Sequence, residues 1–134
     1  MSDFTGAVEE ICVKDNRYRP DSYEFVAQAL HFTQKKLKRE GHLSGRELSE
    51  GAAEFAIEQF GPMAKSVLKH WGITKTEDFG NIVFNMIEKK LLSRTESDSI
   101  NDFKNIYDFE AIFGNVIEDI GKKMRDKKIL QNPH

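Results

Sequence analysis

The sequence predicts a mainly α protein of about six helices with one small β-hairpin. Three observations support this fold class. Apolar residues recur at spacings of three and four along most of the chain, which is the period of an α-helix. Capping residues, glycines and the 3 prolines divide these stretches into separate helices. Residues 103–109 instead place an aromatic ring at nearly every second position, which is strand spacing.

The first two predicted helices are separated by a polar break at Asp15–Arg17. Ser2–Lys14 forms the first helix, with one apolar face that consists of Phe4, Val8, Ile11 and Cys12. The second begins at Pro20, because a proline in the first turn of a helix loses no hydrogen bond. We expect it to run to about Glu40 and to stop at Gly41.

Stop and start signals define the next two helices. Ser44 and Glu47 have the spacing of a capping box, which begins the third helix. Gly61 ends that helix, and Pro62 opens the fourth. The fourth helix is capped by Gly72.

A fifth helix starts near Thr74–Thr76, where Thr74 and Glu77 are spaced as a second capping box. Leu91–Phe109 then predicts two short strands around a polar turn. The last helix begins near Asp108, and its apolar face is formed by Ile112, Phe113, Val116, Ile117, Ile120 and Met124. The whole chain, 1–134, is interpreted as a single domain with a charged C-terminal helix or tail over 114–134.

The order of the elements is that of a winged helix. The helices that start near Ser44, Pro62 and Thr76 precede the hairpin of Leu91–Phe109, so a winged-helix-like core is one way to build this fold. The match concerns topology only, and topology does not define a function.

Composition limits the classes of protein. The 134 residues carry a formal net charge of -2, which gives no whole-chain attraction to polyanions. The 1 cysteine forms no internal disulfide, and the N-terminus lacks the apolar core of a signal peptide. No apolar run is long enough to span a membrane. The expected location is therefore the cytoplasm, with no membrane partner.

The sequence contains no P-loop, GxGxxG, HExxH, CxxC or GxSxG motif, so none of the common catalytic signatures is present. The 4 histidines are far apart, so no metal site is predicted, and no cofactor is expected. A nucleophilic Cys12 would need an adjacent base, and no such partner can be named from the sequence. The oxygen-rich stretch 95–102 lacks the central glycine of an EF-hand loop and is interpreted as a solvated turn.

Nucleic-acid binding has mixed support in the sequence. Asn81 and Asn85 of the fifth helix could read bases, but the hairpin carries Glu96, Asp98 and Asp102, which would repel phosphate. Basic clusters lie at Lys35–Arg39 and Lys122–Lys128, where they also complement helix ends.

Several short motifs resemble those of an uncharacterised bacterial family, the Minf family of planctomycetes, verrucomicrobia and related groups. They are Arg17–Leu30, Gln59–Ala64, Trp71-Gly72, Thr76–Phe84, and the stretch Leu91–Phe113, which contains Asp102–Lys104 and Tyr107–Phe109. The resemblance covers roughly residues 8–113. It implies a bacterial, cytoplasmic protein and no particular activity, substrate, cofactor or catalytic residue.

The function suggested by these observations is a non-enzymatic protein-interaction module, either an adaptor or a self-associating protein. Phe25 and Phe32 lie off the main apolar face of their helix, so this helix is either central or bound to a partner. The alternative is a winged-helix-like regulator associated with nucleic acid. Candidate interaction residues, which could equally cap helices and fix the hairpin, are Arg17, Tyr18, Tyr23, Trp71, Asp78, Arg94, Asp102 and Tyr107.

Overall fold

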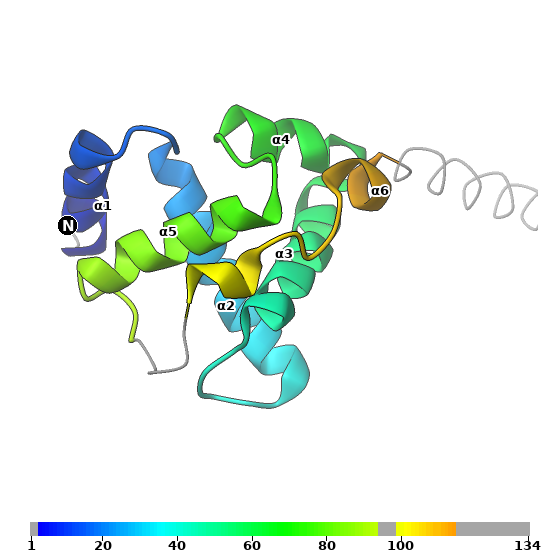
Figure 1. Ribbon diagram of the computed structural model, residues 1–134, viewed down its shortest axis with the longest axis horizontal. Coiled ribbons are helices and arrows are strands. Elements are labelled where there is room, and N and C mark those ends of the chain that lie inside the picture. Colours follow the sequence, from blue (N-terminus) through cyan, green and yellow to red (C-terminus); the bar gives the residue numbers. More distant parts are fainter. Residues whose placement is uncertain (1–2, 94–98, 115–134) are drawn as a thin grey trace, which may run out of the picture.

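The computed structural model describes residues 3–93 and 99–114, and within these residues the chain is helical (Figure 1). The α-helices are α1 (Asp3–Lys14), α2 (Pro20–Leu37), α3 (Gly45–Phe60), α4 (Ala64–His70), α5 (Thr76–Glu88) and α6 (Phe109–Phe113). Two short 3-10 helices, η1 (Gly61–Met63) and η2 (Ile100–Phe103), connect them. The mainly α prediction is confirmed.

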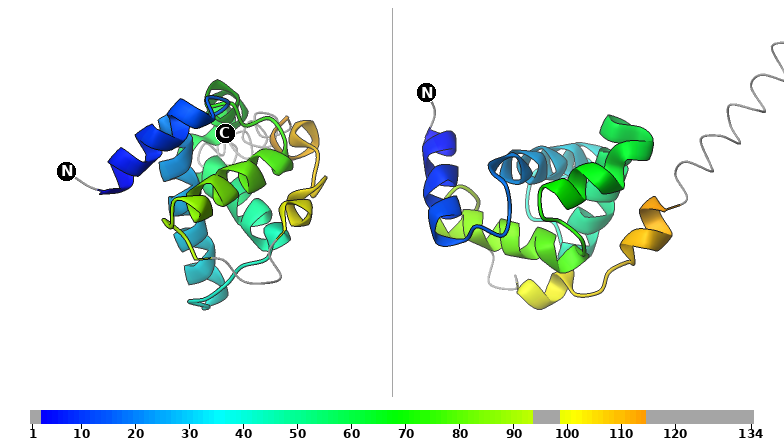
Figure 2. Two further views of the ribbon diagram at one scale, coloured as in Figure 1. Left: turned by 60° about the vertical axis from the view of Figure 1, so that its left-hand side comes forward. Right: turned by 90° about the horizontal axis from the view of Figure 1, so that it is seen from above.

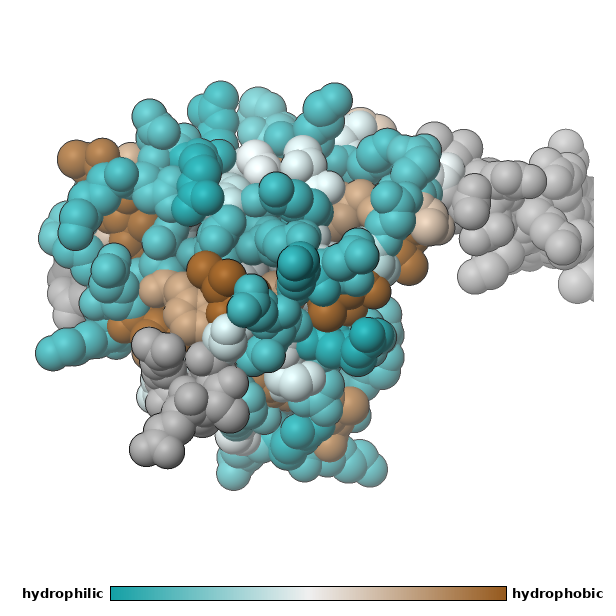
Figure 3. Space-filling view, viewed as in Figure 1, coloured by the Kyte–Doolittle hydropathy of each residue, from teal (hydrophilic) through white to brown (hydrophobic). Residues whose placement is uncertain are grey.

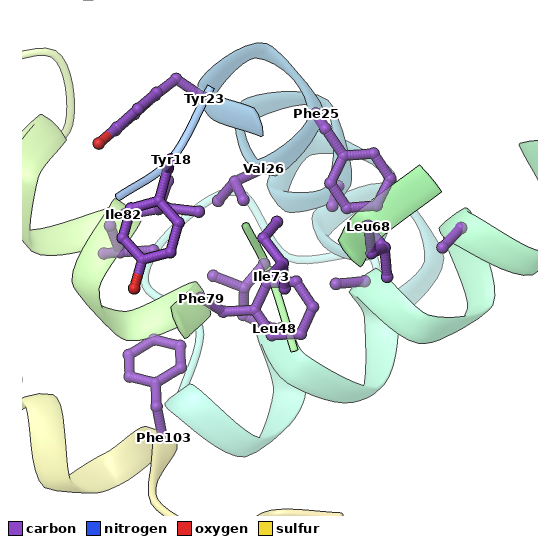
Figure 4. Close-up of a cluster of buried hydrophobic side chains, with 14 of the residues drawn as sticks. Tyr18, Tyr23, Phe25, Val26, Leu48, Leu68, Ile73, Phe79, Ile82 and Phe103 are labelled. Atoms are coloured by element: carbon purple, nitrogen blue, oxygen red, sulfur yellow. The ribbon is translucent and has the colours of Figure 1, made fainter. Parts of the chain in front are cut away.

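Helix α2 packs against α3, and α5 crosses both (Figure 1). Helices α1 and α6 lie at opposite ends of the molecule (Figure 2). One cluster of buried side chains joins the elements, and Tyr23, Phe79 and Leu68 are among its largest fully buried members (Figure 4). Among the described residues, none of the helices combines the length and apolar character that crossing a bilayer needs.

Helix α2 ends earlier than the sequence predicted. Its last helical residue is Leu37 instead of Glu40, because Lys38 adopts a left-handed conformation with φ 54° and its N–H caps the helix. The Gln34 side chain then donates to the carbonyls of Glu40 and Gly41 at 3.1 and 3.0 Å. Gly41 is therefore held in the loop and does not form the cap.

The signals around α3 and α4 were largely correct. The Ser44 hydroxyl accepts the Glu47 N–H at 3.0 Å, and the Glu47 carboxylate accepts the Ser44 N–H at 2.9 Å, which confirms the capping box. Pro62, however, lies in the turn η1, and α4 begins only at Ala64. The glycine that follows α4, Gly72, has φ 97°, as expected for a residue beyond a helix end.

The second predicted capping box, between Thr74 and Glu77, was wrong. Asp78 performs the capping instead: its Oδ2 accepts the N–H groups of Thr74 and Lys75 at 2.9 and 3.2 Å. Asp78 occupies the third position of α5, where a carboxylate both accepts free N–H groups and complements the helix dipole.

The predicted hairpin was also wrong, since no strand occurs among the described residues of Leu91–Phe109. Ser99 and Asp102 form a capping box that starts η2, and Phe103 is buried. Side chains of α5 bind the backbone beyond it. Thr76 Oγ1 donates to the Phe103 carbonyl at 2.6 Å and accepts the Ile106 N–H at 3.1 Å. These bonds replace those of a strand partner, and without a hairpin the winged-helix-like core is not supported.

Asp108 caps α6, because its carboxylate accepts the Ala111 N–H at 3.0 Å. Phe113 is buried, as the last predicted apolar face requires, but Ile112 of the same predicted face is exposed, and the buried partner of Phe113 in this helix is Phe109. The remaining predicted members of that face, and the charged stretch Lys122–Lys128, lie outside the described residues.

Candidate interaction groove

A row of aromatic rings follows the line where α2, α3 and the end of α4 meet. The ring centroid of Phe32 lies 5.1 Å from that of Phe55, and the ring centroid of Phe55 lies 5.5 Å from that of Phe25. Phe25 in turn lies 6.1 Å from Phe60 and 5.6 Å from Trp71. Phe25 is buried, but the other four rings are only partly covered. These five residues therefore form an apolar floor that remains open to solvent.

Two adjoining hollows lie above this floor, and together we call them the aromatic groove. The larger, about 730 Å³, is lined by Phe4, Thr5, Glu24, Ala27, Gln28, His31, Phe32, Lys35 and Phe55. The smaller, about 210 Å³, is lined by Asp21, Glu24, Phe25, Gln28, Phe55, Gln59, Phe60 and Trp71. Because the hollows share Glu24, Gln28 and Phe55, they form one continuous depression along α2.

The exposed side of α2 gives the aromatic groove a charge gradient. Asp21 and Glu24 lie at its first end, beside Trp71. His31 and Lys35 lie toward its other end, where a further hollow adds Lys38. Asp21 and Lys35 are fourteen residues apart, which is about 21 Å along a helix. The groove is therefore acidic at one end and basic at the other.

The face over α5 and η2 has a different character. In Figure 3 hydrophilic residues predominate on this face, and the hydrophobic residues form small, separate groups. Helix α2 lies behind α5 in the same view (Figure 1). The aromatic row thus belongs to another side of the molecule.

A pocket of about 330 Å³ lies between α2, α3, α5 and η2, with Leu48, Val83 and Phe103 in its lining. Ser93 and Ser99 also line it, and they flank residues 94–98, which lie outside the described residues. For that reason we assign this pocket no ligand. Among the described residues there is also no cluster of three metal-binding side chains.

Two of the predicted site residues, Tyr18 and Asp78, meet in the interior. The Tyr18 hydroxyl donates to Asp78 Oδ1 and accepts from Asn81 Nδ2 at 2.9 Å. Burial is the main cause that raises the pKa of Tyr18, and the hydrogen bond to Asp78 adds to it. This cluster connects the loop before α2 to the start of α5, so its role is to position elements.

Arg17 and Tyr23 belong to a neighbouring network around Asp15. Arg17 Nε and Nη2 donate to the two oxygens of Asp15 at 2.9 and 2.7 Å. Asn85 Nδ2 bridges Asp15 Oδ2 and the Tyr23 hydroxyl at 2.9 and 3.0 Å. The bonds from Arg17 hold the pKa of Asp15 well below its usual range. The sequence had suggested that Asn85 contacts the bases of a nucleic acid, but its side chain instead binds Asp15 and Tyr23 within the protein.

The other predicted residues have separate roles. Tyr107 donates to the Ser49 carbonyl at 2.7 Å, and Asp102 closes the capping box of η2 by accepting the Ser99 N–H. Arg94 lies outside the described residues. Of the predicted site residues that the structure describes, only Trp71 lines the aromatic groove. The spacing of Phe25 and Phe32 had indicated that their helix is central or bound to a partner, but Phe55 and Phe60 were missed.

Cys12 has the environment of a structural thiol. Its Sγ donates to the Tyr18 carbonyl at 3.7 Å, and burial, assisted by Asp15, raises its pKa. A raised pKa lowers the thiolate fraction, which is the opposite of what a nucleophile needs.

Comparison of the chain with protein-family models, with curated proteins and with solved structures finds no match. The resemblance to the Minf family therefore stays a prediction.

Proposed function

We propose that this protein is a non-enzymatic interaction module that binds an amphipathic helix of a protein partner in the aromatic groove. The observation that carries the proposal is the row of partly covered rings along α2 and α3. Aromatic residues dominate the energetics of protein interfaces, and a helix in a groove is a recurrent mode of recognition. The groove is long enough for a helix of several turns.

The charge gradient defines the chemistry of the partner. The partner helix would have an apolar stripe, cationic residues at one end and anionic residues at the other. Its cations would contact Asp21 and Glu24, and its anions would contact Lys35. Such complementarity mainly determines orientation and selectivity, while the rings contribute most of the affinity.

Trp71 provides an intrinsic probe, because it is the only tryptophan and lies at the acidic end of the groove. We expect a synthetic amphipathic helix of roughly 18 residues with the matching charge gradient to change Trp71 emission in a saturable way. A control peptide keeps the same composition and apolar stripe but alternates its charges along its length. It should bind about tenfold more weakly.

A groove variant tests where the peptide binds. Ala27 lines the larger hollow on the solvent side of α2, so Ala27→Arg should abolish the peptide response while the fold is retained. Equal binding of both peptides, or equal binding to the variant, would refute the proposal.

No observation in the described residues favours the alternative function, a regulator associated with nucleic acid. Its basis was the hairpin, which is absent from the described residues, and the two asparagines of α5, which bind Tyr18 and Tyr23. In the cluster Lys35–Arg39, Lys36 pairs with Glu54 and Arg39 with Glu47.

A further inference from the structure

We infer that the aromatic groove of one copy binds residues 115–134 of a second copy. This inference rests on the proposed function and names its occupant. Residues 115–134 lie outside the described residues, but their sequence has the chemistry of the proposed helix. Val116, Ile117, Ile120 and Met124 recur at helical spacing, so this segment has an apolar stripe of its own.

The charges of this segment complement the groove. Anions come first, at Glu118 and Asp119. Cations then follow at Lys122, Lys123, Arg125, Lys127 and Lys128, interrupted by one anion, Asp126. The segment therefore changes from acidic to basic along its length, as the groove does along α2. Aligned in opposite directions, the two gradients pair cations with Asp21 and Glu24, and anions with Lys35.

The position of Gly114 favours a second copy over the same chain. Helix α6 packs against α3 and α4, and its Glu110 pairs with Lys65 of α4. The end of α4 also supplies Trp71 to the acidic end of the groove. A segment that entered its own groove from this end would bring Glu118 and Asp119 against Asp21 and Glu24, which is a like-charge contact.

A second copy has no such constraint, since its segment can enter from the opposite end. If two copies exchange their segments, each groove is filled and the contact has two-fold symmetry. The result is a closed dimer with two equivalent contacts.

The test measures the mass of the full-length protein by sedimentation equilibrium. The first variant, Glu24→Lys with Lys35→Glu, cancels the charge of Asp21 at one end of the groove, replaces the cation at the other end with an anion, and preserves the net charge. The second variant, Ile120→Asp, places a charge in the apolar stripe of the segment. We expect a dimer for the natural sequence and association at least about tenfold weaker for either variant. The matched control is Glu88→Lys with Lys104→Glu, which makes the same exchange at exposed sites outside the groove and should remain dimeric.

Mixing the two variants separates exchange from misfolding. The groove variant still carries an intact segment, and the Ile120→Asp variant still carries an intact groove, so their mixture should form a dimer held by one contact. A monomeric natural protein, a dimer that neither variant weakens, or a mixture that stays monomeric would each overturn the inference. If the matching synthetic helix still binds in that case, the proposed function stands and only its occupant is wrong.

Discussion

Tyr18 shows how a single hydroxyl connects two parts of the chain. Its partner Asp78 is only 6% exposed, so loss of the hydroxyl leaves a buried carboxylate oxygen without this donor. We expect Tyr18→Phe to lower the free energy of unfolding by about 1.5–3 kcal/mol, because the bond involves a charged acceptor. Tyr107→Phe removes a bond to a neutral carbonyl and should cost about 0.5–1.5 kcal/mol. Urea unfolding of both variants checks this order, and equal costs would contradict it.

The ionisation of Asp15 makes the stability of the fold depend on pH in the acid range. Its bonds from Arg17 lower its pKa in the folded state, so the carboxylate stabilises the protein at any pH above its unfolded value, about 3.9. That contribution is lost as the pH falls from about 5 toward the lower folded pKa. We expect Asp15→Asn to cost about 1–2 kcal/mol at pH 7 and progressively less below pH 4. A difference from the natural protein that stays constant between pH 3 and 7 would show that the charge of Asp15 has no such role.

At the residue scale, the sequence located polar side chains that matter but could not assign their partners. Tyr18 and Asp78 are sixty residues apart in the chain, and no local pattern predicts that they meet. For the same reason the sequence indicated Phe25, Phe32 and Trp71 separately and did not predict that they share one groove. Its rings come from three helices, and periodicity describes one helix at a time.

The contact between α2 and α3 depends on Gly51. A Cβ at this position would lie 1.8 Å from Thr33 Oγ1, so a side chain there must push the two helices apart. We expect Gly51→Ala to destabilise the protein by about 1–3 kcal/mol despite the better helix propensity of alanine. Gly6→Ala in α1 is the matched control, because a Cβ added there has no atom within 4 Å. This variant should be more stable than the natural protein by up to about 1 kcal/mol, the gain in helix propensity. Thermal unfolding should show a lower melting temperature for Gly51→Ala and a higher one for Gly6→Ala. A raised melting temperature for Gly51→Ala would refute the close contact.

At the element scale, local signals predicted the helices well and failed where a distant side chain decides the backbone. The start of α3 was correct because the Ser44 capping box is contained within four residues. The hairpin was wrong because Thr76, nearly thirty residues away, binds the backbone at Phe103 and Ile106. Asn105, with φ 50°, also breaks the extended conformation that the alternating aromatic residues suggested. The capping pairs Ser99–Asp102 and Asp108–Ala111 were local signals that favoured helical turns.

At the scale of the whole molecule, α1 shares one hydrophobic core with the other helices. We therefore expect α1 to unfold together with them. Val8 and Ile11 of α1 are buried in the same cluster as the side chains of α2 and α5. The chain has 1 cysteine, in α1, and 1 tryptophan, at the end of α4, so each region has its own reporter. We expect the urea midpoint of Cys12 labelling by a maleimide to equal the midpoint of Trp71 emission. A lower midpoint for Cys12 would show that α1 opens before the core, as a separate unit of lower stability.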